Sequence, residues 1–191
     1  MNGATAASGL GVSIVLPIYN AAATLAECLD SIAAQTLTDY ELLAINDGST
    51  DDSAELVRSS MAVDGRIRLL EPGRVGLVAA LNLGLQSAAA PLVARMDADD
   101  IMHATRLEVQ SAYLQQHPHV DLVASQVELF AEHEIQAGFR EYVRWQNECL
   151  SPQAIAANIY VESPVAHPTV MFRRQAVTQL GGYRSGPFPE D

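Results

Sequence analysis

Short apolar runs alternate with segments of helical spacing along the first hundred residues. The runs are rich in Val, Ile and Leu and stop at turn residues such as Pro17 and Asp47, which is typical of strands buried on both faces. Between them, apolar residues recur every three or four positions, as on one face of a helix. The expected strands are 12–16, 40–45, 67–70 and 91–96, and the expected helices are 24–35, 51–60 and 77–89.

This alternation predicts the fold class. Strand–helix–strand order brings successive strands into one sheet as parallel neighbours joined by right-handed crossovers, so we expect an α/β protein with a mostly parallel sheet. Thr24 followed by Glu27 has the spacing of a capping box, which predicts that the Thr24 side chain caps the first helix.

The pattern changes after residue 100. We expect a helix at 105–116 and a longer strand at 120–130, and the mixed segment 131–150 gives no clear assignment. A short helix at 152–158, a strand at 169–172 and a helix at 175–180 complete the prediction. The chain contains no repeat or linker, so we expect one domain over 12–191 after a flexible segment, 1–11, with two halves: 12–100 and 101–191.

Composition excludes several classes of protein. Among 191 residues the net charge is −12, and all 11 basic residues are Arg. An acidic surface does not suit a nucleic-acid or anionic-lipid binder. Two cysteines, Cys28 and Cys149, are too few for a disulfide scaffold, and Cys28 is expected in the core. With no signal-peptide pattern and no apolar run of about 18 residues, we expect no membrane span and a cytoplasmic location, including a peripheral one at the inner face of the membrane.

Turn residues and charges follow each of the four strands of the first half. Because ligands of open α/β sheets bind outside the carboxyl ends of the strands, these residues predict one ligand crevice. The candidates are Pro17 and Tyr19 after the first strand, Asp47 after the second, Arg74 after the third, and Arg95, Asp97 and Asp99 at the fourth.

The acidic cluster 97–100 is the most specific of these features. If the chain is still extended there, Asp97 and Asp99 point to one side, where two carboxylates repel each other unless a cation intervenes. Mg²⁺ or Mn²⁺ accepts carboxylate and phosphate oxygens and would let an acidic protein hold a diphosphate. The alternative is a solvated acidic turn in which Asp99 or Asp100 caps the next helix.

The other candidates also have two readings each. Asp47 can accept an N–H from a nucleobase, or it can serve only as a turn residue. Tyr19 can stack on a base or pack against the following helix. Arg74 and Arg95 are the nearest cations for phosphate, but an ordinary ion pair explains either of them as well.

Taken together, these motifs resemble family 2 glycosyltransferases. The resemblance is carried by the run 12–20, by Asn46-Asp47-Gly48-Ser49 in the second strand and turn, and by Asp97-Ala98-Asp99-Asp100. It extends over the helix near Asn82 and returns at 167–174 and at Gly181-Gly182-Tyr183-Arg184. It is strong over 12–117 and weaker over 118–160.

The resemblance implies a GT-A fold, in which a nucleotide-binding half (12–100) joins an acceptor half (101–191). It implies transfer with inversion from a nucleotide-diphosphate sugar, most commonly a UDP-sugar, to a saccharide or lipid-linked acceptor in surface polysaccharide or lipopolysaccharide synthesis. On the matching positions, Pro17, Tyr19 and Asp47 would line the nucleoside pocket and Arg74 would lie near the base or phosphates. Asp97 would lie near the ribose and sugar, and Asp99, with Asp97 beside it, would bind Mn²⁺ or Mg²⁺.

By the same resemblance Asp191, in the pair Glu190-Asp191, is the expected catalytic base. Because family members normally continue beyond this pair, we expect an acceptor half that is incomplete at its C-terminal end. A non-catalytic nucleotide-sugar-binding module stays open as an alternative. So does a sugar nucleotidyltransferase, although a Gly-rich loop with basic residues after the first strand is missing here.

Overall fold

A six-stranded sheet forms the centre of the computed structural model, which describes residues 11–130 and 135–186. The strand order is β3-β2-β1-β4-β6-β5. β1 to β4 are parallel, and β6 runs antiparallel to both β4 and β5. This confirms the α/β class with a mostly parallel sheet. The strands are β1 (Val12–Ile18), β2 (Tyr40–Asn46), β3 (Ile67–Leu70), β4 (Leu92–Arg95), β5 (Leu122–Val123) and β6 (Met171–Arg173).

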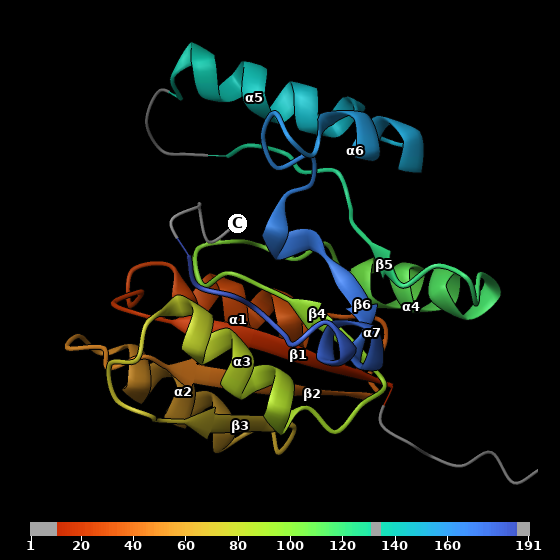
Figure 1. Cartoon of the computed structure of the whole chain (residues 1–191). Helices are drawn as coiled ribbons and strands as arrows, with labels where there is room; N and C mark the ends of the chain where they lie inside the picture. The colour runs from red at the N-terminus through yellow and green to blue at the C-terminus, as the bar shows by residue number, and fades with distance from the viewer. Residues whose placement is uncertain (1–10, 131–134, 187–191) are drawn as a thin grey trace, which may run out of the picture.

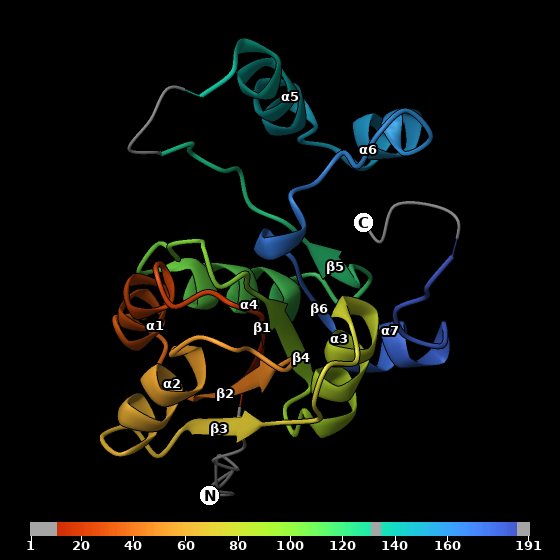
Figure 2. The same cartoon turned by 90° about the vertical axis from the view of Figure 1, so that its left-hand side faces the viewer.

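Helices cover both faces of the sheet, and Figure 2 shows the resulting three layers. Even-numbered residues of β1, such as Ile14, pack with α1, α2 and α4, whereas Val15 packs with α3 on the opposite face. This alternation is the period of two that a strand imposes. The helices are α1 (Leu25–Ala33), α2 (Ser53–Met61) and α4 (Arg106–Gln116) on one face, and α3 (Leu77–Ser87) and α7 (Arg174–Gln179) on the other.

The helical spacing in the sequence determines which side of α1 is buried. Leu25, Cys28, Leu29 and Ile32 lie on one face and are all buried in the core. The expectation for Cys28 is therefore confirmed. Burial, followed by the charges of Asp100, Asp97 and Asp99, raises the pKa of its thiol to about 12.

Two further helices stand away from the layered body, as Figure 1 shows. They are α5 (Ala137–Glu148) and α6 (Pro152–Asn158), and a short 3₁₀ turn, η1 (His167–Thr169), leads back to β6. α5 lies in the segment that received no assignment from the sequence. Its apolar positions 139, 142 and 143 have helical spacing, but Val143 is the only one of its described residues that is buried.

The prediction of a strand over 120–130 is wrong beyond Val123. β5 contains two residues, lies at the edge of the sheet and pairs with the short strand β6. The backbone that follows finds side-chain partners instead of a ladder: the Ser125 N–H donates to Thr169 Oγ1, and the Val127 N–H donates to Asn147 Oδ1. With these groups satisfied, nothing requires the strand to continue.

The predicted capping box at Thr24 is also wrong. Thr24 precedes α1 but makes no side-chain cap hydrogen bond. Its hydroxyl donates to the Ala98 carbonyl, 2.9 Å away, and so ties the start of α1 to the loop after β4.

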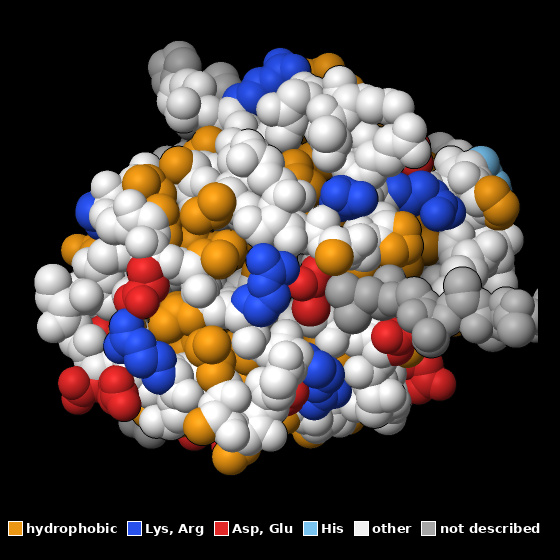
Figure 3. Space-filling model, turned by 90° about the horizontal axis from the view of Figure 1, so that it is seen from below, with side chains coloured by type: hydrophobic (Ala, Val, Ile, Leu, Met, Phe, Trp, Pro, Cys, Tyr) orange, Lys and Arg blue, Asp and Glu red, His pale blue; other side chains and the backbone are white. Residues whose placement is uncertain are grey.

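The surface carries charges of both signs in the part of the chain that the structure describes. On the face seen in Figure 3, Arg side chains lie singly or beside acidic ones, separated by apolar and neutral groups. Among residues 11–130 and 135–186, no helix has the length and apolar character needed to cross a bilayer.

Gly84 on α3 allows the helix to lie close to the sheet and gives a test of this packing. A Cβ there would lie 2.4 Å from Val15 Cγ1 and 3.1 Å from Ile45 Cδ1. We expect Gly84→Ala to lower the free energy of unfolding by about 1–3 kcal/mol in urea denaturation, because overpacking outweighs the better helix propensity of Ala. Gly138→Ala on α5, where a Cβ meets nothing within 4 Å, should cause no loss. Equal stability of the two variants would contradict the packing.

Candidate active site

A hollow of about 550 Å³ lies at the carboxyl ends of β1, β2 and β4. β1 and β4 are the neighbours between which the strand order changes direction, and this is where open α/β sheets bind ligands. The structure brings all seven predicted donor-binding side chains to this one hollow. They are Pro17, Tyr19, Asp47, Arg74, Arg95, Asp97 and Asp99.

The acidic cluster forms a turn rather than an extended continuation of β4. The strand ends at Arg95, and the Asp100 N–H donates to the Asp97 carbonyl at 3.3 Å. The expectation of an extended chain at 97–99, with side chains on alternating sides, is therefore wrong. Asp97 and Asp99 nevertheless line the same hollow. Ala98 between them is buried in the core, which anchors the turn and directs its carboxylates outward.

Neither Asp99 nor Asp100 caps the next helix, as the alternative of a solvated acidic turn required. α4 begins at Arg106, and the residue at its cap position is Thr105. Burial, followed by the charges of Asp97 and Asp99, raises the pKa of Asp100 to about 6. Three carboxylates thus lie within electrostatic reach of one another.

Arg95 supplies a buried positive charge beside these carboxylates. Its side chain is only 7% exposed, and its guanidinium lies 3.1 Å from Asp97 Oδ1. The Nε atom is buried and has no hydrogen-bond partner. An unsatisfied buried donor is uncommon and calls for an explanation, such as a ligand that completes its contacts.

Asp47 joins the turn after β2 to the start of α3. Its carboxylate is 4% exposed and pairs with the Arg74 guanidinium. It also accepts the backbone N–H groups of Val75 at 2.6 Å and Gly76 at 3.0 Å. The Arg74 Cζ atom lies 3.6 Å from the centre of the Tyr19 ring. One face of that ring and most of the carboxylate's acceptor sites are therefore occupied within the chain.

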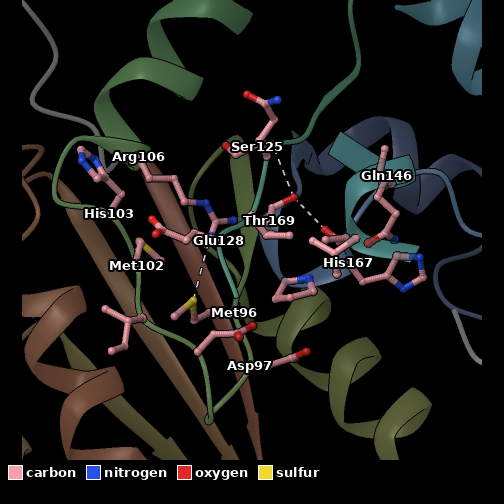
Figure 4. A pocket seen from close by; sticks show the side chains of 18 of the residues that line it. Met96, Asp97, Met102, His103, Arg106, Ser125, Glu128, Gln146, His167 and Thr169 are labelled. Carbon is pink, nitrogen blue, oxygen red and sulfur yellow. Dashed lines mark hydrogen bonds between the residues drawn. The ribbon is translucent and has the colours of Figure 1, made fainter. Parts of the chain in front are cut away.

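A second and larger hollow, of about 950 Å³, lies between the end of β4 and α5. Figure 4 shows Met96 and Asp97 on one side and Gln146 of α5 on another, with His167 and Thr169 of η1 closing it. Its wall includes Phe139 and Tyr142 of α5, and Arg95 and Asp97 line both hollows. The two hollows are therefore neighbours that share a charged wall.

Arg106, which is not among the candidates from the sequence, lies behind this wall. Its guanidinium donates to the carbonyls of Arg95 at 2.9 Å and Val170 at 3.2 Å, and its Nε donates to Gln110 Oε1. Burial lowers the pKa of Arg106 to about 10. Helical spacing gives no sign that a charged residue at a helix start is buried, so only the structure identifies it.

The residues present can hold a hard divalent cation with help from a ligand. Within the described ranges, no three His, Cys, Asp or Glu side chains form a metal-binding group by themselves. Asp97 and Asp99 offer carboxylate oxygens at the edge of one hollow, and Mg²⁺ or Mn²⁺ often binds through one or two carboxylates plus phosphate oxygens. The donor set therefore fits such an ion bound together with a diphosphate.

The expected base, Asp191, and its neighbour Glu190 lie outside the described residues.

Solved structures share this fold over most of the chain. The Staphylococcus aureus TarS fragment 1–349 superposes with a TM-score of 0.70 at 21% identity, covering 95% of this chain and 51% of that one. The mannosyltransferase PcManGT of Pyrobaculum calidifontis, in complex with GDP-Man and Mn²⁺, gives a TM-score of 0.70 at 25% identity, covering 91% and 47%. The expected GT-A fold is thus confirmed.

Curated relatives match in sequence over nearly the whole chain. EpsE of Bacillus subtilis is 33% identical over 180 residues, which are 93% of this chain and 62% of that protein. The amylovoran biosynthesis glycosyltransferase AmsE of Erwinia amylovora is 33% identical over 183 residues, which are 94% and 66%. The chain thus spans about two thirds or less of their length. The glycosyl transferase family 2 profile matches residues 13–181, and the chain belongs to this family.

Proposed function

We propose that this chain carries the donor site of an inverting glycosyltransferase. It would move a sugar from a nucleotide-diphosphate sugar, most often a UDP-sugar, to an acceptor hydroxyl in the synthesis of a surface polysaccharide or lipopolysaccharide. The observation that carries the proposal is the convergence on one hollow of seven polar or ring side chains that come from, or follow, four strands of the sheet. AmsE, named for amylovoran biosynthesis, supports the pathway class.

In this proposal each of the two hollows serves one of the two halves expected for the domain. We assign the smaller one, built mostly from 12–100, to the donor, and the larger one, built mostly from 101–191, to a saccharide or lipid-linked acceptor. The shared wall supports this assignment, since the reacting groups of donor and acceptor must meet at about 3–3.5 Å. The Phe139 and Tyr142 rings, stacked 6.2 Å apart between centroids, offer an apolar surface on the acceptor side.

Within the donor hollow, Tyr19 and Pro17 would contact the nucleoside and Asp47 would face the base. Asp47 is already bound to Arg74, so a base N–H would use its remaining acceptor site or displace the guanidinium. The freed face of Tyr19 would then be open for stacking. Arg74 in its present position closes this end of the hollow and would move toward the phosphates.

Asp99, with Asp97 beside it, would hold Mn²⁺ or Mg²⁺ against the diphosphate. The bound ion would act as a Lewis acid that offsets negative charge on the departing diphosphate. The PcManGT structure contains Mn²⁺ together with GDP-Man, which supports this ligand class. Arg95 adds a fixed positive charge next to the same carboxylates.

The proposed reaction is one displacement. An acceptor oxygen forms a bond to the anomeric carbon while the bond from that carbon to the diphosphate oxygen breaks, which inverts the configuration. The hydroxyl proton passes to a carboxylate, for which Asp191 is the candidate by the family resemblance. Such proton transfer contributes roughly 10²–10⁴-fold to rate.

The alternatives differ in their products. A glycosyltransferase releases UDP from a UDP-sugar when an acceptor is added, whereas a binding module takes up the UDP-sugar and releases nothing. A nucleotidyltransferase instead forms pyrophosphate from a nucleoside triphosphate and a sugar phosphate. Assays of UDP and pyrophosphate release in Mn²⁺, with and without a saccharide acceptor, separate the three.

We expect Asp99→Asn to weaken binding of UDP-GlcNAc in Mn²⁺ by about 10–100-fold in calorimetric titration, because a charged contact worth about 1.5–3 kcal/mol is lost. Asp30→Asn on the exposed side of α1 removes the same charge away from the hollow and should leave the affinity unchanged. Equal affinities for the two variants would remove Asp99 from the donor site.

We expect Tyr19→Leu to weaken UDP binding by about 5–100-fold, since stacking of a base on an aromatic ring is worth roughly 1–3 kcal/mol. Binding of pyrophosphate with Mn²⁺ should not change, because pyrophosphate has no base. Tyr19→Phe keeps the ring and should retain wild-type affinity for both. A parallel loss for UDP and pyrophosphate in Tyr19→Leu would contradict the stacking role.

A further inference from the structure

The side chain of Asn82 connects α3 to a turn 101 residues farther along the chain. Its Nδ2 donates to the Tyr183 carbonyl at 2.9 Å, and its Oδ1 accepts the Tyr183 N–H at 2.9 Å. Both polar groups of the amide are therefore paired with both backbone groups of a single residue. This reciprocal pair fixes the position and the direction of the turn together.

The turn has a backbone conformation that favours glycine. Shortly after α7, Gly181 and Gly182 have φ values of 91° and 76°, in the left-handed region. A Cβ on Gly182 would lie 2.4 Å from Asn82 Oδ1. The turn thus rests directly on the amide, without space for any larger residue.

Tyr183 is held on the α3 side of the sheet, where it packs against the core cluster that includes Leu81 and Leu85. Alternation along β4 places Arg95 on the same face, since Val93 belongs to that cluster. Burial raises the pKa of the Tyr183 phenol, with the Arg95 charge opposing and the Asp97 charge adding to the shift. The Tyr183 ring therefore lies on the face of the sheet from which Arg95 projects, within electrostatic reach of the wall that the two hollows share.

Helix formation does not explain an Asn at this position. Asn is a weaker helix former than Leu, and the flanking residues Leu81 and Leu83 pack against or within the same apolar cluster. A long apolar side chain would suit both the helix and the core. The pairing with Tyr183 is what the amide provides.

We propose that Asn82 is a positioning residue for the sugar transfer: by holding the Gly182–Tyr183 turn, it keeps Tyr183 packed on the face of the sheet where Arg95 lies and so supports the wall that contacts the diphosphate. This inference rests on the proposed function. It assigns to Asn82 an effect on the diphosphate part of the donor and none on the base.

The test compares Asn82→Leu with wild type by titration with UDP and with pyrophosphate, each with Mn²⁺. We expect both affinities to fall by the same factor, about three- to tenfold, in contrast to Tyr19→Leu. Gln86→Leu, an exposed change on the same helix, is the control for helix propensity and should bind as wild type.

Gly182→Ala tests the contact from the other side, with Gly181→Ala as its matched control. Both glycines have positive φ, but a Cβ on Gly181 would lie no closer than 4.0 Å to any neighbour, at Arg184. We expect Gly182→Ala to weaken pyrophosphate binding more than Gly181→Ala does. The double variant Asn82→Leu/Gly182→Ala should bind pyrophosphate no more weakly than the single variant with the larger loss of affinity. The reason is that both substitutions remove the same contact.

If folded Asn82→Leu binds pyrophosphate with wild-type affinity, this inference is overturned while the proposed function stands. Loss of the folded circular-dichroism signal in both Asn82→Leu and Gly182→Ala would assign the contact to folding and overturn it as well. Failure of wild type to bind UDP or pyrophosphate would overturn the proposed function, and this inference with it.

Discussion

The ion pair between Arg95 and Asp97 determines how the carboxyl edge of the sheet is organised. A guanidinium that is almost fully buried is costly unless its charge is compensated, and Asp97, 3.1 Å away, provides that compensation. The pair lies where β4 ends, so it fixes the direction in which the following acidic turn leaves the sheet. It also forms the wall between the two hollows. Arg106 holds the Arg95 carbonyl from behind and keeps this wall in register with η1.

Several contacts around this wall come from distant parts of the chain. The Thr24 hydroxyl binds the Ala98 carbonyl, and the Cys28 thiol lies 3.4 Å from the Asp97 carbonyl, so α1 supports the acidic turn from one face. On the other face, the paired Asn82 and Tyr183 provide the support proposed above. α1 thus holds the backbone of the acidic turn while Asp97 and Asp99 line the hollow. This preorganised arrangement suits a site that must hold a cation and a diphosphate together.

Much of this could be predicted from the sequence, for reasons that are local. Apolar runs and helical spacing identified β1 to β4 and α1 to α3, because both faces of a parallel sheet must be buried. The rule for carboxyl ends placed Asp47, Asp97 and Asp99 at one edge. Contacts between remote residues could not be predicted. The Thr24 hydroxyl donates to the Ala98 carbonyl instead of capping α1. The Ser125 and Val127 N–H groups donate to side chains where a strand was expected. Buried Arg106 was missed for the same reason, since its partners are carbonyls.

The central claim is that the donor site needs a cation held by the carboxylates of the acidic turn. Calorimetric titration of the chain with UDP, in Mn²⁺ and again after removal of divalent ions by a chelator, tests it most directly. The account predicts that affinity falls at least about tenfold, or 1.4 kcal/mol, when the ion is removed. Equal affinity for UDP with and without divalent ions would contradict it.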